Sequence, residues 1–340
     1  MNNVLNQKFN NFFNLWLICL ITLIGLMIIV GGLTRLTDSG LSITKWELFS
    51  GIIPPLSNSD WNLYFELYKQ IPEYKLQNNT MTMSEFKIIF WWEWAHRILG
   101  RIIGIVLLLP LIFFSFKMEF KKLKNLYLIF LLVCVQGFIG WYMVTSGLVD
   151  RVDVSHYRLS IHLFIAFVIL SSLIWYYFNH NKKLNKNFFK DRSQLFSIKI
   201  FTFLIFVQII LGAFVSGLDA GRIYQTWPLM NESYLPDDIN FKNYNEFLNF
   251  NDSSVVQFIH RNVAYIIFLI LLYMGYKIIR LNLKRLYKSY LYLSIFVLVQ
   301  IFLGILALIT NLHIAIASLH QISSIFLIFF TLSFYYKSIN

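Results

Sequence analysis

The chain contains eight apolar runs, each long enough to cross a lipid bilayer. Such a crossing takes about 20 apolar residues in a helix. A helix pairs its own backbone N–H and C=O groups, and this is required because lipid offers them no hydrogen-bond partners. The first run lacks the short apolar core and cleavage pattern of a signal peptide, so we expect it to be retained. The sequence therefore predicts an all-α integral membrane protein with eight transmembrane helices. The runs lie near residues 15–33, 90–116, 126–144, 159–178, 198–217, 256–276, 289–310 and 315–336.

The positive charge of the chain is confined to alternate loops. The net charge is +12, and the loops after the second, fourth and sixth runs are rich in lysine and arginine. In the other loops acidic residues largely balance the basic ones, so the positive-inside rule places both termini in the cytoplasm. Charge spread over short loops does not favour a nucleic-acid partner. The basic residues are Lys117, Lys121, Lys122, Lys124, Lys182, Lys183, Lys186, Lys190, Arg192, Lys277, Arg280, Lys284, Arg285 and Lys288.

The second half of the chain repeats the first. His96 and His260, Gln136 and Gln300, and Gly140 and Gly304 are three pairs with the same spacing. Each half has four runs, and an even number brings the chain back to its starting side, so the halves insert in the same orientation. We expect a parallel tandem repeat of two pseudo-symmetric four-helix bundles, with halves at 1–180 and 181–340.

Each half carries two histidines at the beginning of its even-numbered runs. Helix direction places all four roughly 5–12 Å below the outer boundary. Two imidazoles at one depth on separate helices can bind both faces of a haem iron, whereas zinc requires three or four ligands. A lone intramembrane histidine can instead hydrogen-bond a neighbouring helix, but a matched quartet favours the ligand interpretation. The quartet is His96, His162, His260 and His320; His156, His180 and His313 lie in or beside loops and are not expected to be ligands.

One acidic residue breaks the symmetry of the repeat. Glu93 lies three positions before His96 on the same helix face, and the matching position before His260 is Gln257. A carboxylate within a membrane costs about 2.5–3.5 kcal/mol, so its presence in one half indicates different tasks for the halves. Glu93 could act as a base near a bound porphyrin. A purely structural ion pair with Arg97 is the alternative.

Arg97 and Arg261 each follow a histidine. They are candidate partners for haem propionates, although exposed arginines can also extend toward the membrane surface. In the first long external loop, 34–89, we expect residues 58–60 to cap a short interfacial helix that ends at "IPEYK". The expected apolar face of that helix is Trp61, Leu63, Tyr64, Leu67 and Tyr68.

Long strings in the chain resemble haem A synthase of the alphaproteobacterial and mitochondrial type. They are "GGLTRLTDSGLSITKW" at 31–46, "PEYK" at 72–75, "EFKIIFWWEWAHRILGR" at 85–101, "YRLSIHL" at 157–163, "LDAGRIYQTWPLMN" at 218–231 and "QFIHR" at 257–261. The family has eight helices in two four-helix bundles and oxidises a methyl group of haem O to the formyl group of haem A, for cytochrome oxidases.

The resemblance implies a role for each site residue. His96 and His162 would flank the substrate haem, His260 and His320 would ligate a haem b cofactor, and Glu93 matches the family's essential acid. Cys19 and Cys134 both lie in predicted helices, so the cysteine pair that some bacterial members carry in the first external loop is missing. A disulfide-linked transfer step is therefore not expected.

Two other functions remain open at the level of sequence. The chain could be a di-haem cytochrome b that carries electrons, perhaps from quinol, without modifying haem. A transporter is disfavoured by the parallel repeat and by histidines at one depth. Expected partners are haem O, haem A, haem O synthase (protohaem farnesyltransferase), cytochrome oxidase assembly factors and an unknown electron acceptor.

Overall fold

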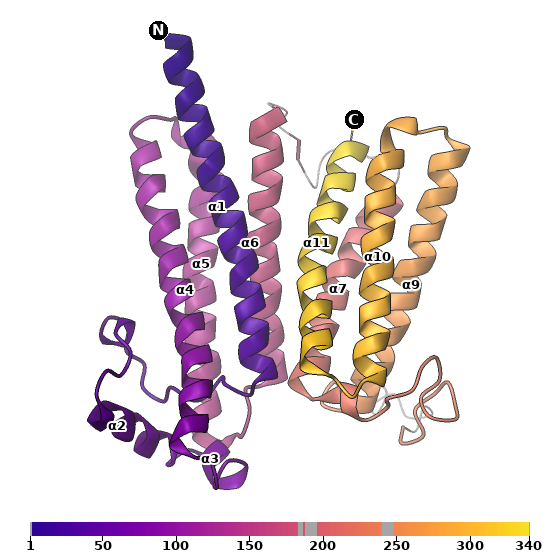
Figure 1. Cartoon of the computed structure of the whole chain (residues 1–340). Coiled ribbons are helices and arrows are strands. Elements are labelled where there is room, and N and C mark those ends of the chain that lie inside the picture. Colours follow the sequence, from indigo (N-terminus) through magenta and orange to yellow (C-terminus); the bar gives the residue numbers. More distant parts are fainter. Residues whose placement is uncertain (1, 183–185, 188–195, 240–247, 340) are drawn as a thin grey trace. The chain divides into compact units, whose positions relative to one another are not determined.

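The computed structural model describes residues 2–182, 186–187, 196–239 and 248–339, and over these ranges it is helical (Figure 1). Eight of the described helices are long and apolar enough to cross a membrane, and within the described residues there is no strand beyond one isolated bridge. The predicted all-α, eight-span fold is therefore confirmed. The eight are α1 (Asn2–Leu36), α4 (Met83–Ser115), α5 (Phe120–Asp150), α6 (His156–Lys182), α7 (Ser197–Gly217), α9 (Ser253–Arg280), α10 (Tyr287–Ile309) and α11 (Ile314–Ser338).

One compact unit comprises Cys19–Ile169. In it α4 packs on α5, the short helix α2 (Asn58–Tyr68) packs on α4, and α3 (Pro72–Leu76) packs on α5 (Figure 1). An aromatic cluster centred on Trp61, Phe86 and Phe90 joins α2 to the beginning of α4. These contacts show that the long loop between α1 and α4 is structured, and its location outside the membrane stays a prediction.

The cap of α2 differs from the sequence-based expectation. Ser57, rather than a residue within 58–60, is the N-cap, and its hydroxyl accepts from the N–H of Asp60 at 3.1 Å while Asp60 completes a capping box. The buried face is Trp61, Phe65 and Tyr68, whereas Leu63 is exposed. The expected face was therefore partly wrong, because Phe65 lies between Trp61 and Tyr68 on the helix and points to α4 with them. "PEYK" does follow the end of α2, but it then forms α3.

The other compact unit comprises Leu170–Asn340 together with Met1–Ile18. Here α7, α9, α10 and α11 contact one another in a closed ring, α7 to α9, α9 to α10, α10 to α11 and α11 to α7. The end of α6 joins this unit through Trp175, whose ring lies 5.2 Å from that of Tyr336. A closed ring of four helices is the packing of a four-helix bundle.

Some sequence-based expectations concern residues that the structure does not describe. Lys183, Lys190 and Arg192 of the second basic loop, and residues 240–247 of the second long external loop, lie outside the described residues. The arrangement of all eight spans as two parallel bundles and the division at 1–180 and 181–340 stay predictions. So does the cytoplasmic location of both termini.

Candidate functional site

The four predicted histidines lie on the four helices expected to carry them. His96 is on α4, His162 on α6, His260 on α9 and His320 on α11. His96 is well inside its helix, because α4 begins at Met83 rather than near residue 90. The ring centroids of His96 and His162 are 6.3 Å apart, and the ring planes are inclined to each other by 52°. Two metal–nitrogen bonds of about 2 Å each, plus the two half-widths of the rings, come to about this separation.

A glycine on a neighbouring helix lies against each imidazole. A Cβ atom at Gly31, Gly140 or Gly304 would be 3.0 Å from Cε1 of His96, His162 or His320, and one at Gly212 would be 3.4 Å from Cε1 of His260. These distances leave little or no room for a side chain larger than hydrogen. The pairs therefore bring each histidine-bearing helix close to the helix that precedes it in the chain.

The imidazoles fit a haem iron as ligands. In all four the Nδ1 nitrogen is buried and has no hydrogen-bond partner, while the residue as a whole is only half-buried. With Nδ1 enclosed, Nε2 is the nitrogen that can reach a bound metal. Within the described residues there is no group of three or more His, Cys, Asp or Glu side chains that could hold a metal ion by itself. Paired imidazoles with an open edge match a bis-histidine haem rather than a zinc site.

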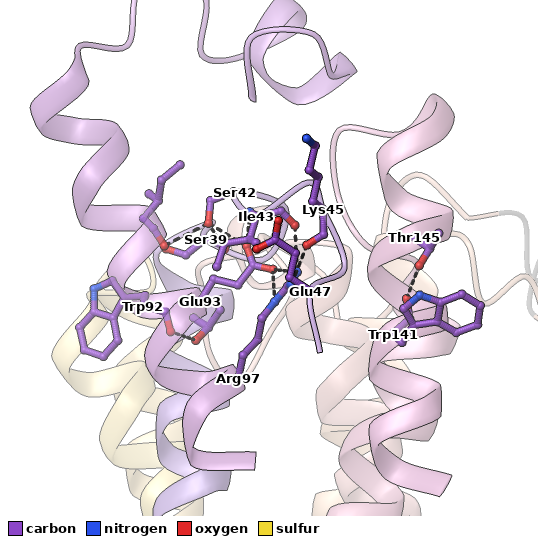
Figure 2. A network of polar contacts seen from close by, with 12 residues as sticks. Ser39, Ser42, Ile43, Lys45, Glu47, Trp92, Glu93, Arg97, Trp141 and Thr145 are labelled. Atoms are coloured by element: carbon purple, nitrogen blue, oxygen red, sulfur yellow. Dashed lines mark hydrogen bonds and ion pairs between the residues drawn. The ribbon is translucent and has the colours of Figure 1, made fainter. Parts of the chain in front are cut away.

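Glu93 is buried in the unit that contains the His96–His162 pair, and its carboxylate accepts four hydrogen bonds (Figure 2). Its Oε2 accepts from the hydroxyl of Ser42 at 2.7 Å and from the backbone N–H of Ile43 at 2.8 Å. Its Oε1 accepts from Nη2 and Nε of Arg97 at 2.6 and 3.1 Å. The structure therefore shows the ion pair that the sequence offered as one interpretation, and it adds a second set of partners from the loop between α1 and α4.

Arg97 ties the same loop to α4. Besides Glu93, its guanidinium donates to the carbonyl oxygen of Ile43 at 2.9 Å and to that of Lys45 at 3.4 Å, and it lies over the ring of Trp46. Arg101, one turn later, donates to the carbonyl of Glu47 at 2.7 Å. The guanidinium of Arg97 is thus engaged with protein groups, and its binding to a haem propionate stays a prediction.

The second half has a similar contact between a loop and a helix, in which an amide replaces the carboxylate. Gln257 Nε2 donates to the carbonyl of Tyr224 at 2.9 Å, and Arg261 donates to the same carbonyl at 2.9 Å. Arg261 keeps a buried Nε without a partner, so a propionate contact stays a prediction here too. Where the first half has a carboxylate and a guanidinium, the second half has an amide and a guanidinium.

The loop that meets these residues is also repeated, which the sequence analysis missed. "DSGLSITKW" at 38–46 and "DAGRIYQTW" at 219–227 have the same length, and both begin with an aspartate in the left-handed backbone region (φ 48° at Asp38, 49° at Asp219). Ile43 and Tyr224 hold matching places in these segments. The shared Asp, Gly and Trp were the signal that could have revealed Ser42 and Ile43.

The remaining histidines are not at these sites. His180 Nε2 lies 2.8 Å from the side-chain oxygen of Asn10, His156 begins α6, and His313 precedes α11. Cys19 and Cys134 are both free and lie on transmembrane helices. That His156, His180 and His313 are not ligands stays a prediction.

Residues 14–332 match the model of the COX15-CtaA family, described as cytochrome oxidase assembly protein. The chain belongs to this family. Among its relatives in the COX15-CtaA family is the heme A synthase of Pelagibacter ubique, 47% identical over 98% of this chain and 99% of the relative. The heme A synthases of Maricaulis maris and Rickettsia bellii are 45% and 43% identical, over 92% of this chain and 92% and 94% of their own lengths.

Proposed function

We propose that this chain is a membrane oxidoreductase that converts haem O to haem A by oxidising a porphyrin methyl group to formyl, for the biogenesis of cytochrome oxidase. The observation that carries the proposal is a pair of imidazoles with ring centroids 6.3 Å apart and a buried carboxylate three residues before one of them. That pair occurs in a member of the COX15-CtaA family, with relatives named heme A synthase over nearly the whole chain.

The two histidine pairs have different roles in this proposal. His96 and His162 bind the substrate haem in the half spanning 1–180, and His260 and His320 bind a haem b in the half spanning 181–340. When bound, haem b supplies one-electron redox chemistry that carries electrons from the substrate to an acceptor. The half with the amide, Gln257, suits a cofactor that must be held unchanged.

Glu93 handles protons in the first half. Its carboxylate is three residues before His96 on α4, and its four contacts use the acceptor sites of both oxygens. Only the Ser42 hydroxyl among its partners can change from donor to acceptor, and the carbonyl of Ile89 lies 3.3 Å from that hydroxyl as an alternative acceptor. When Glu93 takes up a proton, Ser42 can turn to Ile89 while Arg97 and Ile43 keep the side chain in place.

The remaining partners follow from the proposed reaction. The chain resides in the bacterial inner membrane with both termini in the cytoplasm, so the haem sites lie near the outer face. Haem O synthase supplies the substrate, and cytochrome oxidase assembly factors receive the product. The electron acceptor is a separate partner.

The proposal is tested by Glu93→Gln, with haems extracted from membranes, separated and identified by mass. An amide keeps the size of the side chain but cannot take up a proton, so we expect haem A to fall to about a hundredth or less of its normal level, the usual range for loss of an acid–base group. Haem O and haem b should still be bound.

The matched control is Glu47→Gln, the same change of acid to amide in the loop that contacts Glu93. Glu47 accepts from the hydroxyl of Tyr64 at 2.9 Å and is not a partner of Glu93. Haem A should accumulate normally in this control. Normal haem A in Glu93→Gln would show that the carboxylate has no catalytic role.

The rival function is a di-haem cytochrome b that only carries electrons. Its support is that Glu93 and Arg97 both bond to the backbone of Ile43, so the pair can be explained by anchoring the loop to α4. The haem analysis of the unsubstituted protein separates the two functions, because a pure carrier would hold unmodified haem b in both halves.

A further inference from the structure

Three of the four histidines have a glutamine on the neighbouring helix, one turn before the glycine that faces the imidazole. The sequence "VQGFIG" at 135–140 on α5 recurs as "VQIILG" at 207–212 on α7 and "VQIFLG" at 299–304 on α10. In α1 the corresponding segment is "LMIIVG" at 26–31, so Met27 replaces the glutamine. In each case the glutamine and the glycine lie on one long helix, and the histidine lies on the next long helix of the chain.

Each glutamine donates to the backbone of its histidine. The side-chain nitrogens of Gln136, Gln208 and Gln300 lie 2.9, 3.0 and 3.1 Å from the carbonyl oxygens of His162, His260 and His320. A hydrogen bond between transmembrane helices contributes about 0.6 kcal/mol on average and up to about 1–2 kcal/mol. It fixes the distance between the two helices at the level of the ligand.

The amide nitrogens of Gln208 and Gln300 also lie 3.2 and 3.3 Å from Nε2 of their histidines. Because Nε2 is the nitrogen that would bind iron, this second contact would be given up when haem is bound, and the bond to the histidine carbonyl would remain. The hydroxyl of Ser323 donates to Gln300 Oε1 and lies 2.9 Å from the carbonyl of His320, so it holds the amide of Gln300 beside that carbonyl.

His96 has a different neighbour. A thioether carries no N–H, so Met27 cannot make the bond that the three glutamines make. Its methyl group lies 3.4 Å from where a Cβ atom of Gly100 would be, one turn beyond His96. The contact between α1 and α4 at this level is apolar, and the backbone of His96 lacks the glutamine bond.

We infer that the Gln-x-x-x-Gly segment is a positioning device for an axial histidine, and that its replacement by Met27 makes His96 the exchangeable ligand of the quartet. This inference rests on the proposed function, in which the first half must bind haem O and release haem A while the second half keeps its haem b. The substrate haem would stay bound through His162, whose backbone carbonyl is held by Gln136. The bond to His96 would break, on the side where Glu93 lies.

The test measures haem release rather than turnover. Purified protein with its bound haems is mixed with excess apomyoglobin, and transfer is followed by absorbance. We expect a fast phase from the first half and a slow phase from the second. Met27→Gln should slow the fast phase roughly tenfold, within the usual effect of a group that orients a ligand. Met27→Leu, which adds no donor, is the matched control and should leave both phases unchanged.

Gln300→Met is the reverse test, because it removes the glutamine bond to the carbonyl of His320 in the second half. It should accelerate the slow phase roughly tenfold and weaken the low-spin electron paramagnetic resonance signal of the bis-histidine haem. The inference is overturned if Met27→Gln folds and leaves the fast phase unchanged, or if Gln300→Met changes neither the slow phase nor the signal.

The failure of this inference can be distinguished from the failure of the catalytic proposal. If Glu93→Gln still makes haem A while the transfer rates change as expected, the role of Glu93 fails and the positioning device stands. If Glu93→Gln abolishes haem A and the transfer rates do not respond, the device fails and the function stands.

Discussion

At the scale of single residues, Glu73 is a buried acid outside the eight candidate spans. It is 3% exposed on α3, its Oε1 accepts from the hydroxyl of Tyr68 at 3.2 Å, and its Oε2 is buried without a partner. Burial, with the nearby charges of Asp153, Glu93 and Asp38, raises the pKa of Glu73 to about 8. At neutral pH the side chain is therefore mainly the neutral acid, which suits its enclosed position.

This raised pKa gives the fold a dependence on pH. Below pH 4.5 the carboxyl group is protonated in both the folded and the unfolded chain. As the pH rises through about 8 the folded chain must give up its proton at a buried site, so stability is lost between these values. Each unit of raised pKa corresponds to about 1.4 kcal/mol. Glu73→Gln should therefore show a flatter pH dependence and a higher unfolding temperature at pH 9.

The measurement is thermal unfolding in detergent between pH 5 and 9. Glu66→Gln is the control, because Glu66 is an exposed acid on α2 that pairs with Lys69 at 2.7 Å. Equal pH dependence in the original protein and in Glu73→Gln would contradict the assignment.

At the scale of helices, the close approach of glycine to imidazole decides how the pairs pack. Gly140→Ala places a Cβ atom 3.0 Å from Cε1 of His162, so the ring or α5 must move. Overpacking costs about 1–3 kcal/mol, which should weaken haem binding in the first half by roughly tenfold or more. Haem retained per protein after gel filtration, with the low-spin signal, measures the effect.

The control lies on the same helix. A Cβ atom at Gly137 would meet nothing within 4 Å, so Gly137→Ala has the same change in helix propensity without the contact. It should retain haem normally. If the two alanine variants lose haem equally, the contact with His162 has no part in binding.

The helices also show where sequence patterns reach their limit. Hydropathy located all eight spans. In a membrane, the backbone N–H and C=O groups of a long apolar run can pair with one another only in a helix. The face of α2 was partly mistaken, because a short interfacial helix has apolar residues on more than one side and only packing against α4 selected Trp61, Phe65 and Tyr68.

At the scale of the whole molecule, the two halves are expected to hold different haems. His260→Ala removes one ligand of the second pair while the first pair stays intact. We expect loss of haem b alone, with haem O or haem A still bound, identified by mass after extraction. Loss of haem O or haem A with retention of haem b would reverse the assignment of the halves.

The eight spans, the tandem repeat, the histidine quartet and the difference between Glu93 and Gln257 can all be read from the amino-acid sequence. They follow from local hydrophobicity and from spacing along the chain. The contacts of these residues are known only from the folded structure. Ser42 reaches Glu93 across 51 positions, and Arg97 reaches the carbonyl of Ile43 across 54. Such contacts depend on how a loop folds back onto a helix and on which helix face turns inward, and a linear pattern does not contain that information.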